Sequence, residues 1–293
     1  MSDASPMPEA KAEPRFVAAC IQMRSGRDPL ANRDAAVALV REAASQGAHY
    51  VQTPEMTSLV ERDKASLFAN VREQDEDVTL AALRDVARER RIVVHIGSLA
   101  VRNGDKIANR AFLIDAEGAI TASYDKLHLY DVDLPNGERW RESNTYTGGA
   151  CAVVAETPWA PLGIAICYDL RFPALYRALA EAGATILSAP ACFTKQTGEA
   201  HWHVLHRARA IETGSFMLSA AQGGRHEDGR ETYGHSIIVD PWGKVLADAG
   251  GAEPGVILAE IDLARVTEAR GRIPALKHAR PFTVERVGRT GRA

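Results

Sequence analysis

Short apolar runs alternate along the chain with segments whose apolar residues recur at helical spacing. Residues 15–23 (RFVAACIQM) have the pattern of a buried β-strand, and residues 28–47 predict an amphipathic helix that ends at Gly47. The elements predicted after it are a strand at 48–55, a helix near 77–90, a strand at 91–99, and a hairpin at 109–126 that turns at residues 116–118. This first half therefore alternates strands and helices and closes on a hairpin.

The second half of the chain repeats this order. Its predicted elements are a strand at 162–169, a helix at 172–183, a strand at 184–191, a helix at 199–213, a strand at 215–223 and a hairpin at 235–248. The peptide at 47–55 (GAHYVQTPE) matches the one at 183–191 (GATILSAPA), and 112–120 (FLIDAEGAI) matches 236–245 (SIIVDPWGKV) once one residue is allowed. The repeat predicts two related β-α-β-α-β halves.

Two such halves predict an α/β protein in which helices cover the outer face of each sheet. Packing the two sheets against each other gives a four-layer αββα sandwich, which is the fold that we expect. A single doubly wound sheet is the alternative that the pattern leaves open. With 293 residues, the chain is expected to form one domain at 15–273, between a disordered tail at 1–14 and a C-terminal arm at 274–293.

Composition and charge exclude several classes of protein. Hydrophobic residues make up 46% and charged residues 25% of the chain, which is ordinary for a soluble protein with a sizeable core. The 35 Lys and Arg residues against 38 Asp and Glu residues leave a net charge of −3 and no basic stripe, which argues against a nucleic-acid partner. No apolar run approaches the ~20 residues of a membrane span, and the opening residues lack the pattern of a signal peptide. We therefore expect a cytoplasmic protein with no membrane partner.

Cys167 lies where the apolar run LGIAI gives way to a helix, so it is a candidate nucleophile. Backbone N–H groups at the start of a helix favour a thiolate. The competing interpretation is a small buried hydrophobe, which is how we read the other cysteines, Cys20, Cys151 and Cys192. No cysteine falls in a C-x-x-C pair or a secreted framework, which predicts reduced thiols.

Two further ionisable residues, Glu55 and Lys126, also follow strands. Glu55 comes directly after an apolar strand, where we expect burial to raise its pKa and to suit it to proton transfer. Lys126 closes the first hairpin. Taken singly, the glutamate would be a strand-terminal surface carboxylate and the lysine a sheet-edge charge. Together with Cys167 they supply an acid–base group, a cation and a nucleophile, which are the parts of an acyl-transfer site.

Three separated motifs resemble the glutamate, lysine and cysteine motifs of the nitrilase superfamily: TPEM (53–56), YDKLHLYDVD (124–133) and GIAICYDLRFP (163–173). The resemblance extends over residues 15–281. It implies that Cys167 is the nucleophile, Glu55 the general base, and Lys126 the cation that stabilises the oxyanion and aids proton delivery to the leaving nitrogen. It also implies that Glu142 helps to orient the lysine and the substrate, with a solvated loop carboxylate as the alternative.

This resemblance implies hydrolysis of the carbon–nitrogen bond of a small carboxylated amide through a cysteine thioester, without a metal or an organic cofactor. True nitrilases tend to carry tryptophan and glutamate directly after the cysteine, whereas Tyr168 and Asp169 resemble the amidase branches. The segments at 167–173, 200–213 and 220–226 are most similar to the deaminated-glutathione amidases, with the omega-amidases of 2-oxoglutaramate and 2-oxosuccinamate next. A catalytically silent binding or scaffold relative and an N-acyltransferase are the alternatives from other classes.

Substrate contacts are expected close to the cysteine. The backbone N–H of Tyr168 is a candidate donor to the oxyanion. Arg171 lies four residues beyond Cys167 and is our candidate partner for a substrate carboxylate. A structural ion pair between Arg171 and Asp169 is the alternative.

Other motifs add little chemistry. His201, His203 and His206 do not share one helix face, so we expect helix residues and no metal site. The absence of G-x-G-x-x-G, Walker and G-x-S-x-G motifs disfavours nucleotide-dependent chemistry and a serine hydrolase. The C-terminal arm is basic and is expected to be solvated or to cross to another subunit; it carries Lys277, Arg280, Arg286, Arg289 and Arg292 against Glu285. The family resemblance implies a homodimer or a higher homo-oligomer.

Overall fold

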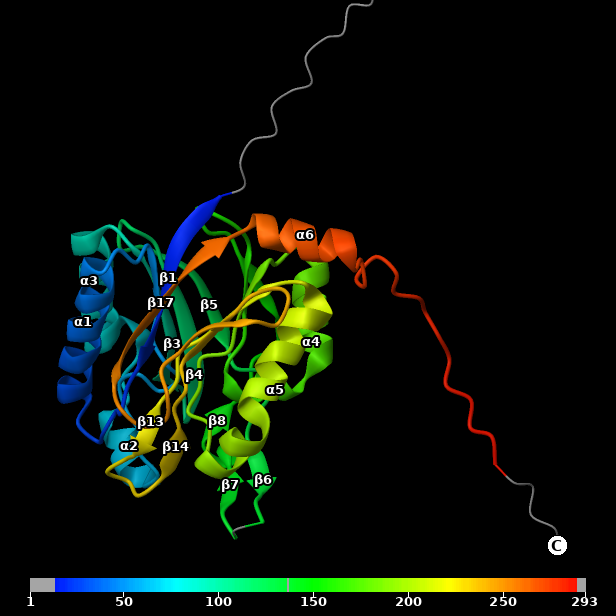
Figure 1. The fold of residues 1–293 in the computed structure, drawn as a ribbon. Helices are drawn as coiled ribbons and strands as arrows, with labels where there is room; N and C mark the ends of the chain where they lie inside the picture. Colours follow the sequence, from blue (N-terminus) through cyan, green and yellow to red (C-terminus); the bar gives the residue numbers. More distant parts are fainter. Residues whose placement is uncertain (1–13, 136, 289–293) are drawn as a thin grey trace, which may run out of the picture.

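Two β-sheets lie face to face in the computed structural model, which describes residues 14–135 and 137–288 (Figure 1). The strands of the first sheet are, in order, β17 (Gly255–Asp262), β1 (Arg15–Gln22), β2 (Tyr50–Gln52), β3 (Val93–Asn103), β4 (Lys106–Ile114) and β5 (Ile120–Asp125), with β8 (Tyr146–Thr147) beside β4. Those of the second sheet are β16 (Val245–Asp248), β15 (Ile237–Val239), β12 (Phe216–Ser219), β11 (Ile186–Ser188), β10 (Leu162–Ile164) and β9 (Val153–Ala155).

Helices cover the outer face of each sheet. The first sheet carries α1 (Pro29–Ser45) and α3 (Val78–Arg90), and the second carries α4 (Pro173–Glu181) and α5 (Lys195–Thr213) (Figure 1). The expected four-layer αββα sandwich is therefore confirmed, and the single doubly wound sheet is excluded.

The two sheets share one topology. In the first sheet β1, β2 and β3 are parallel, and the hairpin of β4 and β5 continues the sheet antiparallel. In the second sheet β10, β11 and β12 are parallel, and the hairpin of β15 and β16 continues it in the same way. Both halves thus contain the order that the internal repeat predicts.

Strand β1 shows why the inner strands read as continuous apolar runs. Ala18 and Cys20 belong to the core between the two sheets, whereas Ala19 and Ile21 belong to the core under α1 and α3. All four residues are fully buried. Because successive side chains of a strand point to opposite faces, a strand that is apolar on both faces must lie in an inner layer.

The helix ends follow the local sequence. The side chain of Asp28 accepts a hydrogen bond from the N–H of Leu30 at the start of α1, Pro29 takes the first helical position, and the chain turns beyond the helix at Gly47 with φ of +92°. Helix α5 begins at Lys195, before the predicted start at residue 199. Its first turn (KQTG) is polar, so apolar spacing gives no signal for it.

Several elements carry no signal that the sequence analysis detected. They are β6 (Asp131–Asp133), β7 (Arg139–Arg141), β13 (Gly223–Arg225), β14 (Glu231–Tyr233), α2 (Lys64–Asn70), α6 (Ala264–Arg272) and β17, together with short 3-10 helices that include η2 (Glu142–Asn144) and η3 (Cys167–Arg171). Most are too short or too polar for a periodic pattern. Strand β17 is apolar, but it lies outside the repeat and returns to pair antiparallel with β1.

The described C-terminal residues lie outside the sandwich. Of the predicted N-terminal tail, residues 1–13 lie outside the described residues, and so do residues 289–293 of the predicted arm. Residues 274–288 contain no helix or strand and run away from the two sheets (Figure 1). The domain bounds at 15–273 stay a prediction. No helix within the described ranges is both long enough and apolar enough to cross a membrane.

Candidate active site

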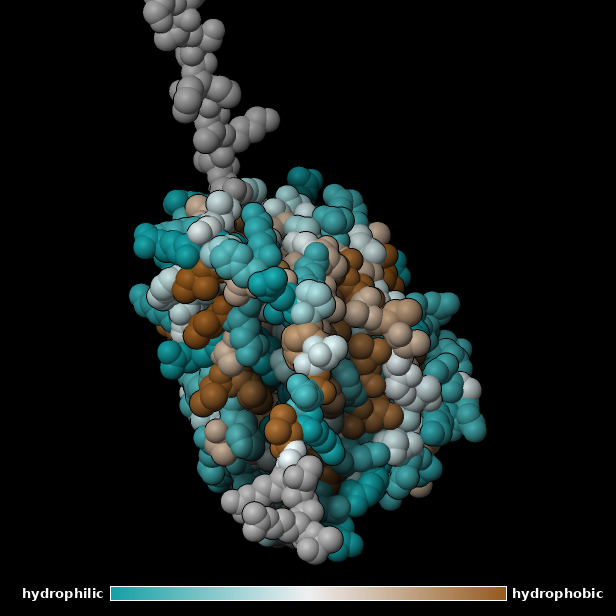
Figure 2. All heavy atoms as spheres, turned by 90° about the vertical axis from the view of Figure 1, so that its right-hand side faces the viewer, coloured by the Kyte–Doolittle hydropathy of each residue, from teal (hydrophilic) through white to brown (hydrophobic). Residues whose placement is uncertain are grey.

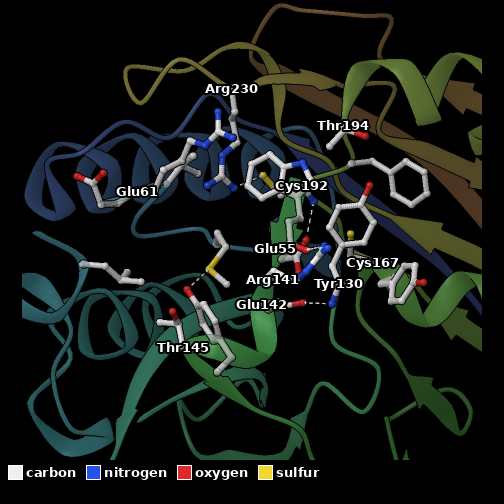
Figure 3. Close-up of a pocket in the computed structure, with 18 of the residues that line it drawn as sticks. Glu55, Glu61, Tyr130, Arg141, Glu142, Thr145, Cys167, Cys192, Thr194 and Arg230 are labelled. Atoms are coloured by element: carbon white, nitrogen blue, oxygen red, sulfur yellow. Dashed lines mark hydrogen bonds between the residues drawn. The ribbon is translucent and has the colours of Figure 1, made fainter. Parts of the chain in front are cut away.

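A pocket of about 280 Å³ opens where strands of both sheets end (Figure 3). Glu55 follows β2, Lys126 follows β5 and Cys167 follows β10, and all three side chains line the pocket. Glu142, at the start of η2, and Tyr168, in η3, line it too. The structure therefore brings together five of the six residues that the sequence singled out.

The ammonium group of Lys126 lies between two carboxylates. Its Nζ donates to Glu55 Oε1 at 2.9 Å and approaches the two oxygens of Glu142 at 3.1 and 3.0 Å. The side-chain amide of Asn109 also donates to both carboxylates, at 2.9 Å to Glu55 and 3.2 Å to Glu142. Lys126 is 2% exposed and Glu55 is 4% exposed, so the network is shielded from water.

Backbone N–H groups hold the same two carboxylates. The N–H of Cys192 donates to Glu55 Oε2 at 2.8 Å, and the N–H of Tyr130 donates to Glu142 Oε2 at 2.6 Å. Because Cys192 follows β11 of the second sheet, Glu55 is fixed by residues of both halves. These contacts exclude a sheet-edge charge for Lys126 and a solvated loop carboxylate for Glu142.

The neighbouring charges set the protonation of the lysine and the glutamate. Burial opposes the charge of Glu55, but Lys126 and hydrogen bonds from Cys167, Lys126 and Asn109 outweigh it and lower the pKa of Glu55. Our expectation that burial would raise this pKa is wrong, because it considered burial alone and left out the charge of Lys126. For Lys126, Glu142 and Glu55 likewise outweigh burial and raise its pKa well above the usual value. The resting site thus holds a carboxylate and an ammonium.

Cys167 is the first residue of η3, in a strained turn that follows β10. Its φ of +48° lies in the left-handed region, which costs a non-glycine residue on the order of 1 kcal/mol or more. Its N–H donates to the carbonyl of Pro190 at 3.0 Å, which holds the turn. Burial and the charge of Glu55 raise the pKa of the Cys167 thiol well above its usual value, although Lys126 opposes them. The expected preference for a thiolate is therefore wrong for the resting site, where a neutral thiol faces a carboxylate.

Asp169 ties the cysteine turn to the first half of the chain. Its fully buried carboxylate accepts hydrogen bonds from the hydroxyl of Tyr124 at 2.7 Å and from the N–H of Ile166 at 2.9 Å. It also accepts from the N–H of His128 at 3.1 Å, and Nδ1 of that residue lies 2.7 Å away. Since Tyr124 and His128 flank the lysine in sequence, one carboxylate positions the lysine loop and the cysteine turn together.

Arg171 does not lie where the sequence predicted. It is not among the pocket-lining residues; its guanidinium carbon lies 5.1 Å from the ring centre of Phe193, and its Nη1 lies 3.1 Å from Nδ1 of His201. Turn η3 therefore directs it towards α5. The alternative ion pair with Asp169 is not formed either, because other donors surround that carboxylate.

Several pocket residues were outside the sequence-based set. The sequence did carry a signal for Asn109, because it is a polar residue within the largely apolar strand β4. The structure buries it fully, and a buried polar side chain needs hydrogen-bond partners. Cys192 lines the pocket and is half-buried, and Cys151 is exposed, so only Cys20 is the small buried hydrophobe that we expected of all three. Spacing along the chain gave no signal for Arg230, which reaches the pocket from just before β14.

The histidines of α5 do not form one cluster. His206 is buried and lies 2.8 Å from Ser219 Oγ, and burial lowers its pKa to about 3. His203 instead meets His235 and Asp248, and one ligand atom from each of these three residues lies within 4.8 Å of the others. The carboxylate of Asp248 lies 2.8 Å from each imidazole, so a cation would compete with both contacts. This cluster lies outside the pocket.

Comparison with known proteins assigns the family. Residues 17–271 match the family described as carbon-nitrogen hydrolase, so the chain belongs to the carbon–nitrogen hydrolases of the nitrilase superfamily. It is 41% identical over 297 residues to the deaminated glutathione amidase of Homo sapiens, which covers 97% of this chain and 90% of that relative. The class that the three motifs predicted, an amidase that cleaves carbon–nitrogen bonds, is confirmed.

Solved structures agree with this assignment. The NitFhit protein of C. elegans superimposes with a TM-score of 0.84 at 35% identity over 92% of this chain, and this chain spans 66% of that protein. An amidase from Nesterenkonia sp. AN1 superimposes with a TM-score of 0.74 at 27% identity, covering 88% of this chain and 98% of its own. The protein in that structure is a mutant of the amidase, seen after Michael addition of acrylamide at its active site cysteine.

The contacts of Asp169 predict that it positions the catalytic groups. Asp169→Asn turns an acceptor into a donor against buried N–H and O–H groups, so we expect a loss of about 1–3 kcal/mol of stability and at least about tenfold in kcat/KM. Denaturant unfolding and amide-hydrolysis kinetics measure the two effects.

A matched control is Asp240→Asn. Asp240 is also buried and accepts from the N–H groups of Trp242 and Lys244 at 2.9 Å, but it lies outside the pocket. The Asp240→Asn variant should lose stability but keep the kcat/KM of the unmodified enzyme. Full activity in folded Asp169→Asn would contradict the positioning role.

Proposed function

We propose that the protein hydrolyses the amide bond of deaminated glutathione through a thioester on Cys167. The observation that carries the chemistry is the buried ion network of Glu55, Lys126 and Glu142 beside the thiol of Cys167. The substrate rests on the similarity to deaminated glutathione amidases along nearly the whole chain.

The first half of the reaction uses the resting protonation states. Glu55 takes the proton of the Cys167 thiol, and the sulfur attacks the amide carbonyl. Negative charge then develops on the carbonyl oxygen, where Lys126 Nζ and the backbone N–H of Tyr168 are the proposed donors. A preorganised donor of this kind contributes roughly 3 kcal/mol to transition-state stabilisation. Glu142 keeps the ammonium in place.

Collapse of this intermediate completes acylation. The proton held by Glu55 passes to the leaving nitrogen, with Lys126 fixing the carboxyl group in position, and the carbon–nitrogen bond breaks. Deaminated glutathione carries an oxo group in place of its amino group, so cysteinylglycine leaves and a 2-oxoglutaryl group stays on Cys167. Glu55 then takes a proton from water, which attacks the thioester. As the carbon–sulfur bond breaks, the carboxylic acid is freed and Glu55 returns the proton to the sulfur of Cys167. Every proton in this sequence has a carrier among the residues named, so no step calls for a metal or an organic cofactor.

Trapping the thioester tests the proposal. Intact-protein mass spectrometry of enzyme quenched during turnover of deaminated glutathione should show a 2-oxoglutaryl adduct, and peptide mapping should place it on Cys167. Cys167→Ala should fold normally but lose turnover and adduct, because it removes the nucleophile and only a few buried atoms. Cys151→Ala, at an exposed cysteine outside the pocket, is the matched control and should keep both.

A second substrate separates the amidase branches. The compact acid 2-oxoglutaramate forms the same adduct with ammonia as the leaving group, so kcat/KM for the two substrates can be compared directly. We expect the higher value for deaminated glutathione. A clear preference for 2-oxoglutaramate would assign the omega-amidase activity, and no turnover of either amide would favour a binding or scaffold role.

We also propose that the protein is a homodimer, with the cytoplasm as its site of action. Figure 2 shows apolar side chains gathered on the face that carries α4 and α5. On α5, Val204 is 67% and Ile211 53% exposed, and Trp242, in the turn between β15 and β16, is 58% exposed. Covering such side chains favours association.

Light scattering should give about twice the chain mass of 31.7 kDa for the unmodified protein. Val204→Glu combined with Ile211→Glu should lower the measured mass to that of the monomer, because the two carboxylates would be buried in the dimer contact. A monomer before substitution would contradict the dimer.

A further inference from the structure

Two guanidinium groups of the pocket wall lie on one indole ring. The guanidinium carbon of Arg62 lies 4.4 Å from the ring centre of Trp140, and that of Arg230 lies 4.9 Å from it. Arg62 precedes α2, Trp140 lies in β7 and Arg230 precedes β14, and all three line the pocket. We call these three residues the arginine cluster. Stacking on an aromatic face holds a guanidinium in place while its N–H groups stay free to bind an anion.

Arg230 retains donors that the protein does not use. Its Nε donates to Asp228 at 3.0 Å, and its Nη1 reaches only the sulfur of Cys192, a weak acceptor, at 3.7 Å. Its Nη2 has no hydrogen-bond partner in residues 14–135 and 137–288, although the side chain is only 16% exposed. A guanidinium with so little access to water needs an acceptor for its remaining N–H groups.

Arg62 is an even less engaged cation. Within the described part of the chain it forms no hydrogen bond or ion pair, and its guanidinium lies over the indole of Trp140. The nearby carboxylate of Glu61 does not neutralise it, because Glu61 pairs with Arg27 at 2.5 Å. The cluster therefore carries a positive charge that no carboxylate of the pocket balances fully.

The other cations of the pocket have partners. Lys126 lies between two glutamates, and Arg139 and Arg141 pair with Asp133. Lys64 donates to the carbonyl of Asn144 at 3.4 Å. Among the described pocket residues, the arginine cluster thus combines spare donors with guanidinium groups that an aromatic ring holds in place.

Part of the cluster lies closer to solvent than the catalytic sulfur does. In Figure 3, Cys192 lies between Arg230 and Cys167. Cys167 is 7% exposed, whereas Arg62 is exposed at the pocket mouth. During catalysis the acyl group stays on the buried sulfur, and the amine has to leave through the mouth before water attacks. We therefore expect the amine portion of a bound amide to point towards the solvent side of the pocket, where Arg62 lies.

We infer that the arginine cluster binds a carboxylate carried by the leaving group of the amide. A guanidinium binds a carboxylate through two parallel hydrogen bonds, for which Nη1 and Nη2 of Arg230 are available. The inference rests on the proposed function: in deaminated glutathione the leaving group is cysteinylglycine, which ends in a carboxylate. Arg230, with Arg62, thus takes the role of anion partner that the sequence suggested for Arg171. A simple primary amide releases ammonia and gains nothing from this subsite.

The test compares three substrates that share one acyl group: deaminated glutathione, its C-terminal carboxamide, and 2-oxoglutaramate. In the unmodified enzyme, replacing the terminal carboxylate by a carboxamide should lower kcat/KM by about tenfold or more, mainly through KM. Arg230→Met should lower kcat/KM for deaminated glutathione by a similar factor. It should change kcat/KM by less than about threefold for the other two substrates, which lack the leaving-group carboxylate.

Two further variants keep the test decisive. Arg225→Met changes an exposed arginine of the same hairpin that lies outside the pocket, and it should leave all three values unchanged. If Arg230→Met fails to fold because Asp228 loses its partner, Arg62→Met decides instead, since Arg62 is exposed. It should show the same substrate pattern at a smaller amplitude.

Two results would overturn the inference in distinguishable ways. Equal losses on all three substrates in the folded variant would give the arginine a structural role and leave the proposed function standing. An unmodified enzyme that hydrolyses 2-oxoglutaramate but not deaminated glutathione would overturn the proposed function, and the inference with it.

Discussion

The pairing of one buried ammonium with two carboxylates is the constraint on which the site depends. Taking Lys126 out of water costs several kcal/mol unless opposite charges and hydrogen bonds surround it, and breaking such a pair commonly costs 3–5 kcal/mol. Glu55 and Glu142 meet this need, and Asn109 bridges them. The same pairing keeps Glu55 ionised and thus ready to accept the proton of a neutral thiol. The same contacts therefore set the protonation of the catalytic residues and stabilise the buried charges.

The two-sheet architecture is what makes this pairing possible. The lysine and its carboxylates come from the first half of the chain, whereas Cys167 and the N–H of Cys192 come from the second. Only a fold that sets the strand ends of both sheets against each other brings them together. Asp169 links the two halves of the chain, because its carboxylate accepts hydrogen bonds from groups of both halves. The strain at Cys167 is held by these neighbours, which leaves the sulfur facing the pocket.

The sequence predicted the features that follow from periodicity and from position at strand ends. Buried strands, alternating helices and the internal repeat gave the sandwich. Glu55 and Cys167 were found because each follows an apolar strand, and Lys126 because it closes a predicted hairpin. The wrong predictions concern properties that depend on where a side chain points and on which groups lie near it in space. The pKa shift of Glu55 was predicted from burial alone, and the charge of Lys126 reverses it. Arg171 was chosen for its nearness in sequence to the cysteine, but its guanidinium lies on Phe193 and beside His201, outside the residues that line the pocket.

The pH dependence of Cys167 alkylation shows whether Glu55 and Lys126 set the protonation of the thiol. Iodoacetamide labelling of the Cys167 peptide, followed by mass spectrometry across pH, reports the thiol pKa in the unmodified enzyme, in Glu55→Gln and in Lys126→Met. Because Glu55 raises and Lys126 lowers this pKa, Glu55→Gln should move the midpoint to lower pH while amide turnover is lost, and Lys126→Met should move it to higher pH. A midpoint that stays in place or rises in Glu55→Gln would contradict the account.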